Sequence, residues 1–138
     1  MRIEIDDILL NKAAIIERCV RRILEEYRGC PELDDFTHLD ALTLNIERAC
    51  QAAIDMAMHI VASGHLGMPQ TASGAFELIF RKGIINEKLY GSLKKMIGFR
   101  NIAIHEYQIL DNEIVRYIAE YGYKDFMEYC RQLGITLK

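Results

Sequence analysis

Two long stretches of the chain repeat apolar residues at alternating intervals of three and four, the spacing of helices that pack along a narrow seam. Nothing in the sequence alternates for long with the two-residue period of a β-strand. We therefore predict an all-α fold built on two long helices. The first seam is Leu9, Ala13, Ile16, Val20, Ile23 and Tyr27, and the second is Leu39, Leu42, Ile46, Ala49, Ala53, Met56 and Ile60.

Glycine and proline mark the ends of these helices, because neither residue favours the interior of a helix. The first predicted helix runs from about Asp7 to Arg28, where Gly29-Cys30-Pro31 ends it. The second runs from about Asp35 to Ser63, and Gly64 ends it.

Capping residues divide the remainder of the chain into shorter helices. Thr71 or Ser73 can cap a short helix that extends toward Gly83, and Asn86 caps a helix that persists to about His105 or Glu106. Asp111 caps a last helical stretch, which we expect Gly122 to break in two before Gly134 ends it. The sequence thus predicts one domain over residues 1–138, an antiparallel bundle of four to six helices.

The residue composition indicates in which cellular compartment the protein resides. The segment MRIEIDDILLNK carries acids where a signal peptide would be apolar, and no apolar run approaches the ~18 residues needed to cross a bilayer. The cysteines form no C-x-x-C pair, so we interpret them as reduced thiols, mostly core fillers, without a metal. We predict a cytoplasmic protein with no membrane association and no cofactor. The cysteines are Cys19, Cys30, Cys50 and Cys130.

The formal net charge of −3 limits how this chain can bind nucleic acid, because a broad electrostatic footprint needs a basic protein. Any RNA site must therefore be a local cluster. A polar row runs beside the second seam at helical spacing, and it borders either a cleft or a subunit interface, or is a partly solvated flank. The row is Asn45, Arg48, Ala52, Asp55 and His59.

Arg100 does not fit the pattern of its own helix. At about 100° per residue it falls at the centre of an apolar stripe, and burying a guanidinium without partners costs several kcal/mol. It is therefore paired with an acid, or it points into a cleft or interface where an anion can meet it. The stripe is Leu89, Leu93, Met96, Ile97, Ala103 and Ile104.

Asn101 and His105 lie on one ridge of the same helix, beside the row of Arg100. Arg100 and His105 diverge by roughly 140° around the helix axis and ~7.5 Å along it, so they flank a groove more readily than they meet at one atom. Arginine binds phosphate, an imidazole moves protons near neutral pH, and an amide can orient either group. This set suits metal-free attack of a ribose 2′-hydroxyl on its neighbouring phosphate.

The segment GFRNIAIHEY, from Gly98 to Tyr107, resembles the Arg-x4-His signature of the HEPN superfamily, and its His-x-Tyr ending resembles the HepT branch. Two other stretches also resemble HepT proteins, LNIERACQAAIDMAMHI from Leu44 to Ile60 and GHLGMPQTASGAFELIFRKGII from Gly64 to Ile85. The likeness thus covers most of the chain in the expected order.

The resemblance implies a single HEPN-type domain that forms a homodimer or higher oligomer and brings two copies of the motif together. It implies a metal-independent endoribonuclease toxin with an RNA substrate, and an MntA-like nucleotidyltransferase antitoxin as its partner. By resemblance, Arg100 and His105 are the catalytic pair and Asn101 supports them. Tyr107 is then the residue to which the partner attaches AMP.

Two other functions stay open at this point. The chain could be a non-catalytic nucleotide- or substrate-binding subunit of a minimal nucleotidyltransferase, with Arg100 holding a phosphate. It could also be a helical oligomerisation scaffold, in which Arg100 pairs with an acid such as Asp55 or Glu47. In the scaffold, removal of Arg100 would leave a buried charge unpaired and destabilise the fold.

Overall fold

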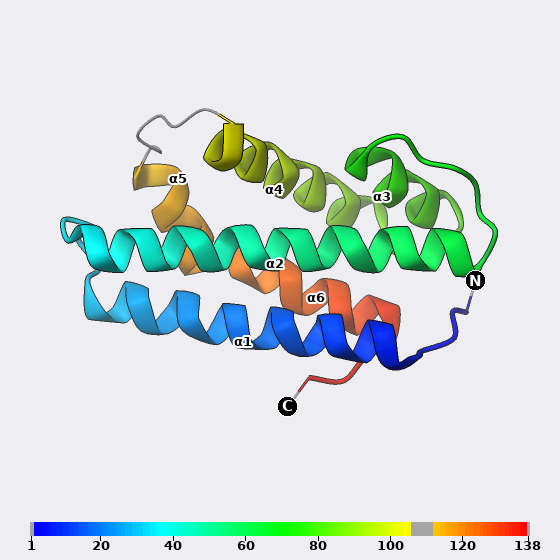
Figure 1. Cartoon of the computed structure of the whole chain (residues 1–138), viewed down its shortest axis with the longest axis horizontal. Coiled ribbons are helices and arrows are strands. Elements are labelled where there is room, and N and C mark those ends of the chain that lie inside the picture. Colours follow the sequence, from blue (N-terminus) through cyan, green and yellow to red (C-terminus); the bar gives the residue numbers. More distant parts are fainter. Residues whose placement is uncertain (1, 106–111, 138) are drawn as a thin grey trace.

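The computed structural model describes residues 2–105 and 112–137, with residues 102–105 described by their backbone alone. All of the secondary structure in these ranges is helical, which confirms the all-α prediction (Figure 1). The elements are α1 (Asp7–Gly29), α2 (Phe36–Ser63), α3 (Ala72–Arg81), α4 (Glu87–His105), α5 (Asn112–Tyr117), the π-helix η1 (Ile118–Gly122) and α6 (Tyr123–Leu133).

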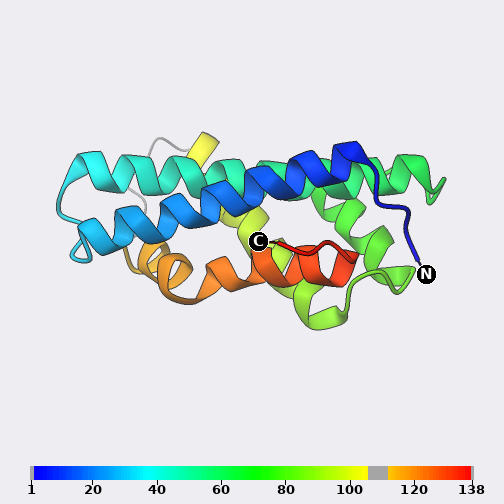
Figure 2. The ribbon, with the colours of Figure 1, turned by 90° about the horizontal axis from the view of Figure 1, so that it is seen from below.

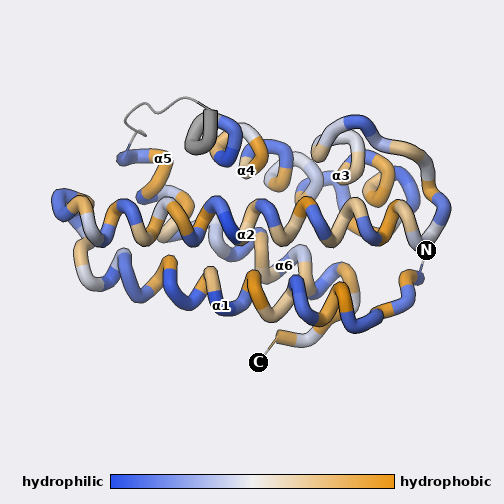
Figure 3. Tube along the Cα trace, viewed as in Figure 1, coloured by the Kyte–Doolittle hydropathy of each residue, from blue (hydrophilic) through white to orange (hydrophobic). Residues whose placement is uncertain are grey.

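The helices form two layers. α1 and α2 lie side by side and antiparallel along the whole length of the molecule (Figure 1). Seen from below, α3, α4 and α6 form a second layer against this pair, and the far end of α4 rises beside α2 (Figure 2). The core lies between the layers, and both predicted seams point into it, with only Tyr27 and Leu39 partly exposed. Hydrophilic and hydrophobic positions accordingly alternate along α1 and α2 (Figure 3).

Side-chain caps start the helices where the sequence predicted them. Of the two candidates before α3, Thr71 is the cap, because its hydroxyl accepts a hydrogen bond from the Gly74 amide at 2.9 Å. Asn86 caps α4 by accepting from the Leu89 amide at 2.8 Å, and Asp35 caps α2 in the same way. The predicted cap at Asp111 lies outside the described residues.

The last helical stretch is divided into two α-helices at Gly122, as predicted, but not by a break in the helical backbone. The backbone stays helical through this residue and widens into the π-helix η1 between α5 and α6. Gly122 is buried against α4, and a Cβ added to it would lie 2.8 Å from the Cε atom of Met96. The small residue at this position thus lets two helices pack closely and does not act as a helix breaker. Gly134 does end α6, in a left-handed conformation with φ 90°.

Tyr129 joins α6 to α2 in the centre of the core. Its ring is fully buried and lies edge-on to Phe76, with ring centroids 5.8 Å apart. Its hydroxyl donates a hydrogen bond to the carbonyl oxygen of Ala53 at 3.0 Å. The small side chain of Ala53 lets α6 approach the α2 backbone this closely.

The cysteines are free thiols, and three of the four are buried, as predicted. Burial raises the pKa of Cys50 and of Cys130 to about 12, so both stay protonated and unreactive at neutral pH. Cys30 is the exception, because it is partly exposed and its thiol donates to Asp34 Oδ1 at 3.1 Å. Within the described ranges, none of the helices has the length and apolar character that a bilayer crossing requires.

Candidate active site

The side chain of Arg100 leaves α4 and rests on α2. Its guanidinium donates one hydrogen bond to Gln51 Oε1 at 2.5 Å and another to Asn101 Oδ1 at 3.3 Å. The Nε atom of Arg100 is buried and has no hydrogen-bond partner in the part of the chain that the structure describes. The guanidinium is thus fixed by neutral amides and retains its charge for an anion.

The acids near Arg100 do not form an ion pair with it among the described residues. Asp55, one of the two carboxylates proposed for that pairing, binds Lys12 Nζ at 3.1 Å instead. Gln51 connects the two groups, since its amide nitrogen donates to Asp55 Oδ1 at 2.9 Å while its oxygen accepts from Arg100. The predicted direct contact with Asp55 is therefore replaced by a bridge through Gln51.

Glu47 is the second carboxylate, one helical turn before Gln51 on α2. Burial raises its pKa, and the positive charge of Arg100 acts in the opposite direction without cancelling the shift. Arg100 therefore influences Glu47 through space while its hydrogen bonds go to Gln51 and Asn101. Desolvation of a carboxylate beside a half-buried cation is a common feature of functional sites.

Of the four predicted site residues, the structure describes Arg100 and Asn101 in full. Arg100 and Asn101 are in contact, through a hydrogen bond that helical spacing did not predict. His105 is the last residue of α4, on the same helix as Arg100, and its side chain lies outside the described part. Tyr107 lies outside the described residues altogether. In the described ranges, no group of three or more His, Cys, Asp or Glu side chains is placed to hold a metal ion.

Gln51 is a site residue that the sequence analysis did not identify. It stands outside the polar row, and nothing in a single sequence connects a glutamine of α2 with an arginine of α4. The one available signal was its position a helical turn after Glu47, which had been named as a possible partner of Arg100.

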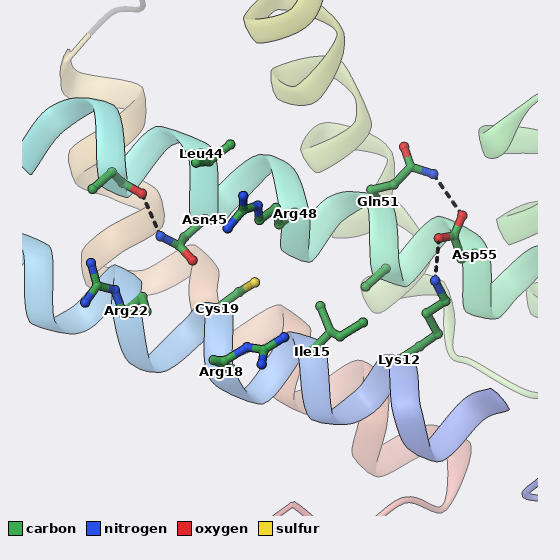
Figure 4. Close-up of a pocket in the computed structure, with 12 residues that line it drawn as sticks. Lys12, Ile15, Arg18, Cys19, Arg22, Leu44, Asn45, Arg48, Gln51 and Asp55 are labelled. Atoms are coloured by element: carbon green, nitrogen blue, oxygen red, sulfur yellow. Dashed lines mark hydrogen bonds and ion pairs between the residues drawn. The ribbon is translucent and has the colours of Figure 1, made fainter. Parts of the chain in front are cut away.

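A groove runs between α1 and α2 on the side that the second layer does not cover, and we call it the α1–α2 groove (Figure 4). Its volume is about 670 Å³. Of the alternatives that the sequence left open for the polar row, the structure shows the border of a cleft for Asn45, Arg48, Ala52 and Asp55, which all line the groove. His59 departs from the row, because it pairs with Asp6 at 2.6 Å near the start of α1.

This two-layer helical bundle matches the fold of solved HEPN toxins, which places the chain in that class of all-α proteins. Within this class, a family model described as Ribonuclease HepT-like matches residues 13–133. The chain belongs to the HepT-like family.

Individual relatives agree with this assignment. The mRNA nuclease HepT of Shewanella oneidensis is 41% identical over 125 residues, which cover 90% of this chain and 94% of the relative. The tri-AMPylated Shewanella oneidensis HEPN toxin, solved in complex with MNT antitoxin, is 39% identical with a TM-score of 0.89, and the match covers 94% of this chain and 98% of that one.

A more distant structure shares the fold alone. The cytosolic protein YutE from Bacillus subtilis, of unknown function, is 13% identical with a TM-score of 0.72. The match covers 86% of this chain and 85% of that one.

Proposed function

We propose that this protein is the toxin of a toxin–antitoxin pair and acts as a metal-independent endoribonuclease through Arg100 and His105. The observation that carries the proposal is the state of Arg100. Its guanidinium is half-buried, hydrogen-bonded to Gln51 and Asn101, and not ion-paired to a carboxylate among the described residues. A fixed cation that is not already neutralised is suited to hold a phosphate.

The proposed reaction is transfer of the RNA phosphate to the neighbouring 2′-oxygen. The imidazole of His105 removes the proton of the 2′-hydroxyl, the 2′-oxygen forms a bond to phosphorus, and the bond from phosphorus to the 5′-oxygen breaks. The leaving 5′-oxygen takes a proton from an imidazolium, which the second motif of a homodimer would supply. Arg100 stabilises the negative charge that builds on the phosphate oxygens, and Asn101 holds the guanidinium in place.

Variants of the catalytic pair test this mechanism. Arg100→Ala and His105→Ala should each abolish RNA cleavage by the purified, partner-free protein in EDTA, while helical content and melting stay close to those of the unaltered protein. Arg81→Ala and His65→Asn, at exposed positions away from the site, should cleave normally. A folded Arg100→Ala or His105→Ala protein with full activity would refute the assignment. If the unaltered protein does not cleave RNA, the result would favour the alternative function, a non-catalytic nucleotide-binding subunit of a nucleotidyltransferase.

The proposed partner is an MntA-like nucleotidyltransferase that silences the toxin by attaching AMP to Tyr107. Supporting this, the Shewanella oneidensis HEPN toxin was solved tri-AMPylated and in complex with MNT antitoxin. An AMP group two residues beyond His105 would place a phosphate within reach of Arg100 and would repel and obstruct an incoming RNA strand.

Mass spectrometry tests the modification. After co-expression with the partner, intact mass and peptide mapping should locate AMP on Tyr107, and the modified protein should not cleave RNA. Tyr117→Phe, at an exposed tyrosine, should leave the modification and silencing intact. AMP found only at other residues, or full covalent silencing of Tyr107→Phe, would contradict the proposal.

A further inference from the structure

The α1–α2 groove gathers positive charge in a chain whose net charge is −3. Four cations line it, and two of them are neutralised locally. Lys12 is paired with Asp55 at 3.1 Å, and Arg22 with a neighbouring acid of α1 at 2.7 Å. The other two are Arg18 and Arg48.

Arg18 and Arg48 are the unneutralised cations of the groove. Both are exposed, and neither forms an ion pair or a side-chain hydrogen bond within the described part of the chain. They stand on opposite walls, Arg18 on α1 and Arg48 on α2 (Figure 4). Both charges also act on the Cys19 thiol between them, lowering a pKa that burial raises. The two guanidiniums therefore share one space, which is open to an anion.

The groove and the candidate active site share one residue of α2. Gln51 lines the groove and also accepts the hydrogen bond of Arg100. The two sites thus lie on either side of one helix, whose diameter with side chains is about 10 Å. At 3.4 Å per residue of a stacked strand, about three nucleotides span that distance.

We propose that the α1–α2 groove binds the phosphate backbone of single-stranded RNA a few nucleotides away from the bond held at Arg100. This inference rests on the proposed ribonuclease function. Arginine is the side chain best suited to phosphate, and a local cluster is the form that RNA binding must take in an acidic protein. The shared residue Gln51 favours an RNA strand over an acidic protein surface, because a strand that is held at Arg100 and runs across α2 would meet the groove.

The binding test uses a 5′-fluorescein single-stranded RNA and fluorescence anisotropy in the His105→Ala background, where no cleavage is expected. Replacing both Arg18 and Arg48 by Gln should weaken binding at least tenfold at low salt. Each phosphate contact with a single strand contributes about −0.7 to the slope of log K against log salt, so the slope should become shallower by about 1.4. Arg18→Lys with Arg48→Lys retains the charges and should keep a slope close to that of the parent.

The matched control replaces Arg81 and Arg131 by Gln, which changes the net charge equally at exposed sites outside the groove. This control should bind as the parent does. Unchanged binding by the groove variant, or an equal loss in the control, would overturn the proposal. So would loss of self-association or of antitoxin binding with RNA affinity unchanged, which would make the groove a protein interface.

Cleavage kinetics with His105 intact separate this inference from the function on which it rests. The Gln variant at Arg18 and Arg48 should show a KM raised at least tenfold and a kcat within about twofold, since the cations act on binding and not on the reacting atoms. If the groove variant is active with an unchanged KM, the groove does not bind the substrate. The proposed ribonuclease function is not affected by that result. Absence of cleavage by the unaltered protein refutes the ribonuclease itself.

Discussion

Arg100 depends on Gln51 for its position, since that amide oxygen accepts its shortest hydrogen bond. A hydrogen bond to a charged group contributes ~1.5–3 kcal/mol. In the proposed mechanism this hydrogen bond orients the guanidinium toward the reacting phosphate. Gln51→Ala should therefore lower kcat about tenfold or more, with a smaller effect on KM. Gln51→Glu should also be slow, because a carboxylate would neutralise Arg100 in competition with the phosphate.

Steady-state cleavage kinetics check this expectation. Gln70→Ala, at an exposed position outside the site, serves as the control and should behave as the unaltered protein. A Gln51→Ala protein with unchanged kcat would show that Gln51 only packs against Arg100.

Glu47 should make stability depend on pH. Its pKa is raised in the folded protein by burial, so the folded state holds the proton more tightly than the unfolded chain. Stability therefore falls as pH rises from the ordinary glutamate pKa of ~4.3 through the raised folded value, and the loss persists above it. Glu47→Gln should consequently be more stable than the unaltered protein at pH 7, and the difference should shrink toward pH 4.

Denaturant unfolding at several pH values measures this difference, with exposed Glu32→Gln as the control. An equal stability gain at pH 4 and pH 7 would assign the effect to something other than ionisation of Glu47.

At this scale the sequence identified the anomalous residue but not its surroundings. Arg100 was conspicuous because helical periodicity placed a guanidinium in an apolar stripe. In the structure the side chain of Arg100 lies against α2, where its hydrogen-bond acceptor is Gln51 and not an acid. Such a contact joins residues far apart in the chain, and one sequence carries no pattern that would pair them.

Among the elements, Gly122 offers the sharpest test of packing. Alanine at this position gains up to ~1 kcal/mol of helix propensity. Its Cβ comes too close only to the flexible end of Met96, since its contacts with Ile118 at 3.4 and 3.6 Å are ordinary ones. Gly122→Ala should therefore be close to neutral. Gly122→Val adds branched atoms against the same contact and should cost about 1–3 kcal/mol, the usual penalty of overpacking.

Thermal or denaturant unfolding of a double-mutant cycle tests this packing. In a Met96→Ala background the cost of Gly122→Val should fall clearly, because the obstructing Cε is gone. The same cost in both backgrounds would show that strain in η1, and not contact with α4, determines the residue at this position.

Helices proved the most predictable level of the structure. The three-and-four spacing of α1 and α2 identified their buried faces. The polar cap Asn86 located the start of α4, and two candidate caps, of which Thr71 is the cap, located that of α3. The π-helix was not predicted. In the sequence, a glycine that ends a helix cannot be distinguished from one that allows a second helix to pack closely. That distinction depends on Met96 of another helix.

For the whole molecule we predict a homodimer at micromolar concentration. Arg100 and His105 diverge on one helix, so a second copy of the motif is the simplest source of a complete cleft. Large apolar side chains are also exposed beside α4, among them Ile114 and Tyr117 of α5. Sedimentation velocity should give a species of twice the 15.9 kDa chain mass. A sample that sediments only as a 15.9 kDa species would refute the shared cleft.

The placement of charge has a kinetic consequence. The protein is acidic overall, yet two unpaired arginines face each other across one groove. A polyanion is therefore repelled at long range but attracted close to Arg18 and Arg48. The Debye length shortens from about 30 Å at 0.01 M salt to about 10 Å at 0.1 M, so added salt first screens the long-range repulsion and only later the attraction. We expect the rate of encounter with RNA to pass through a maximum as ionic strength rises, where a uniformly basic protein would show a steady decline.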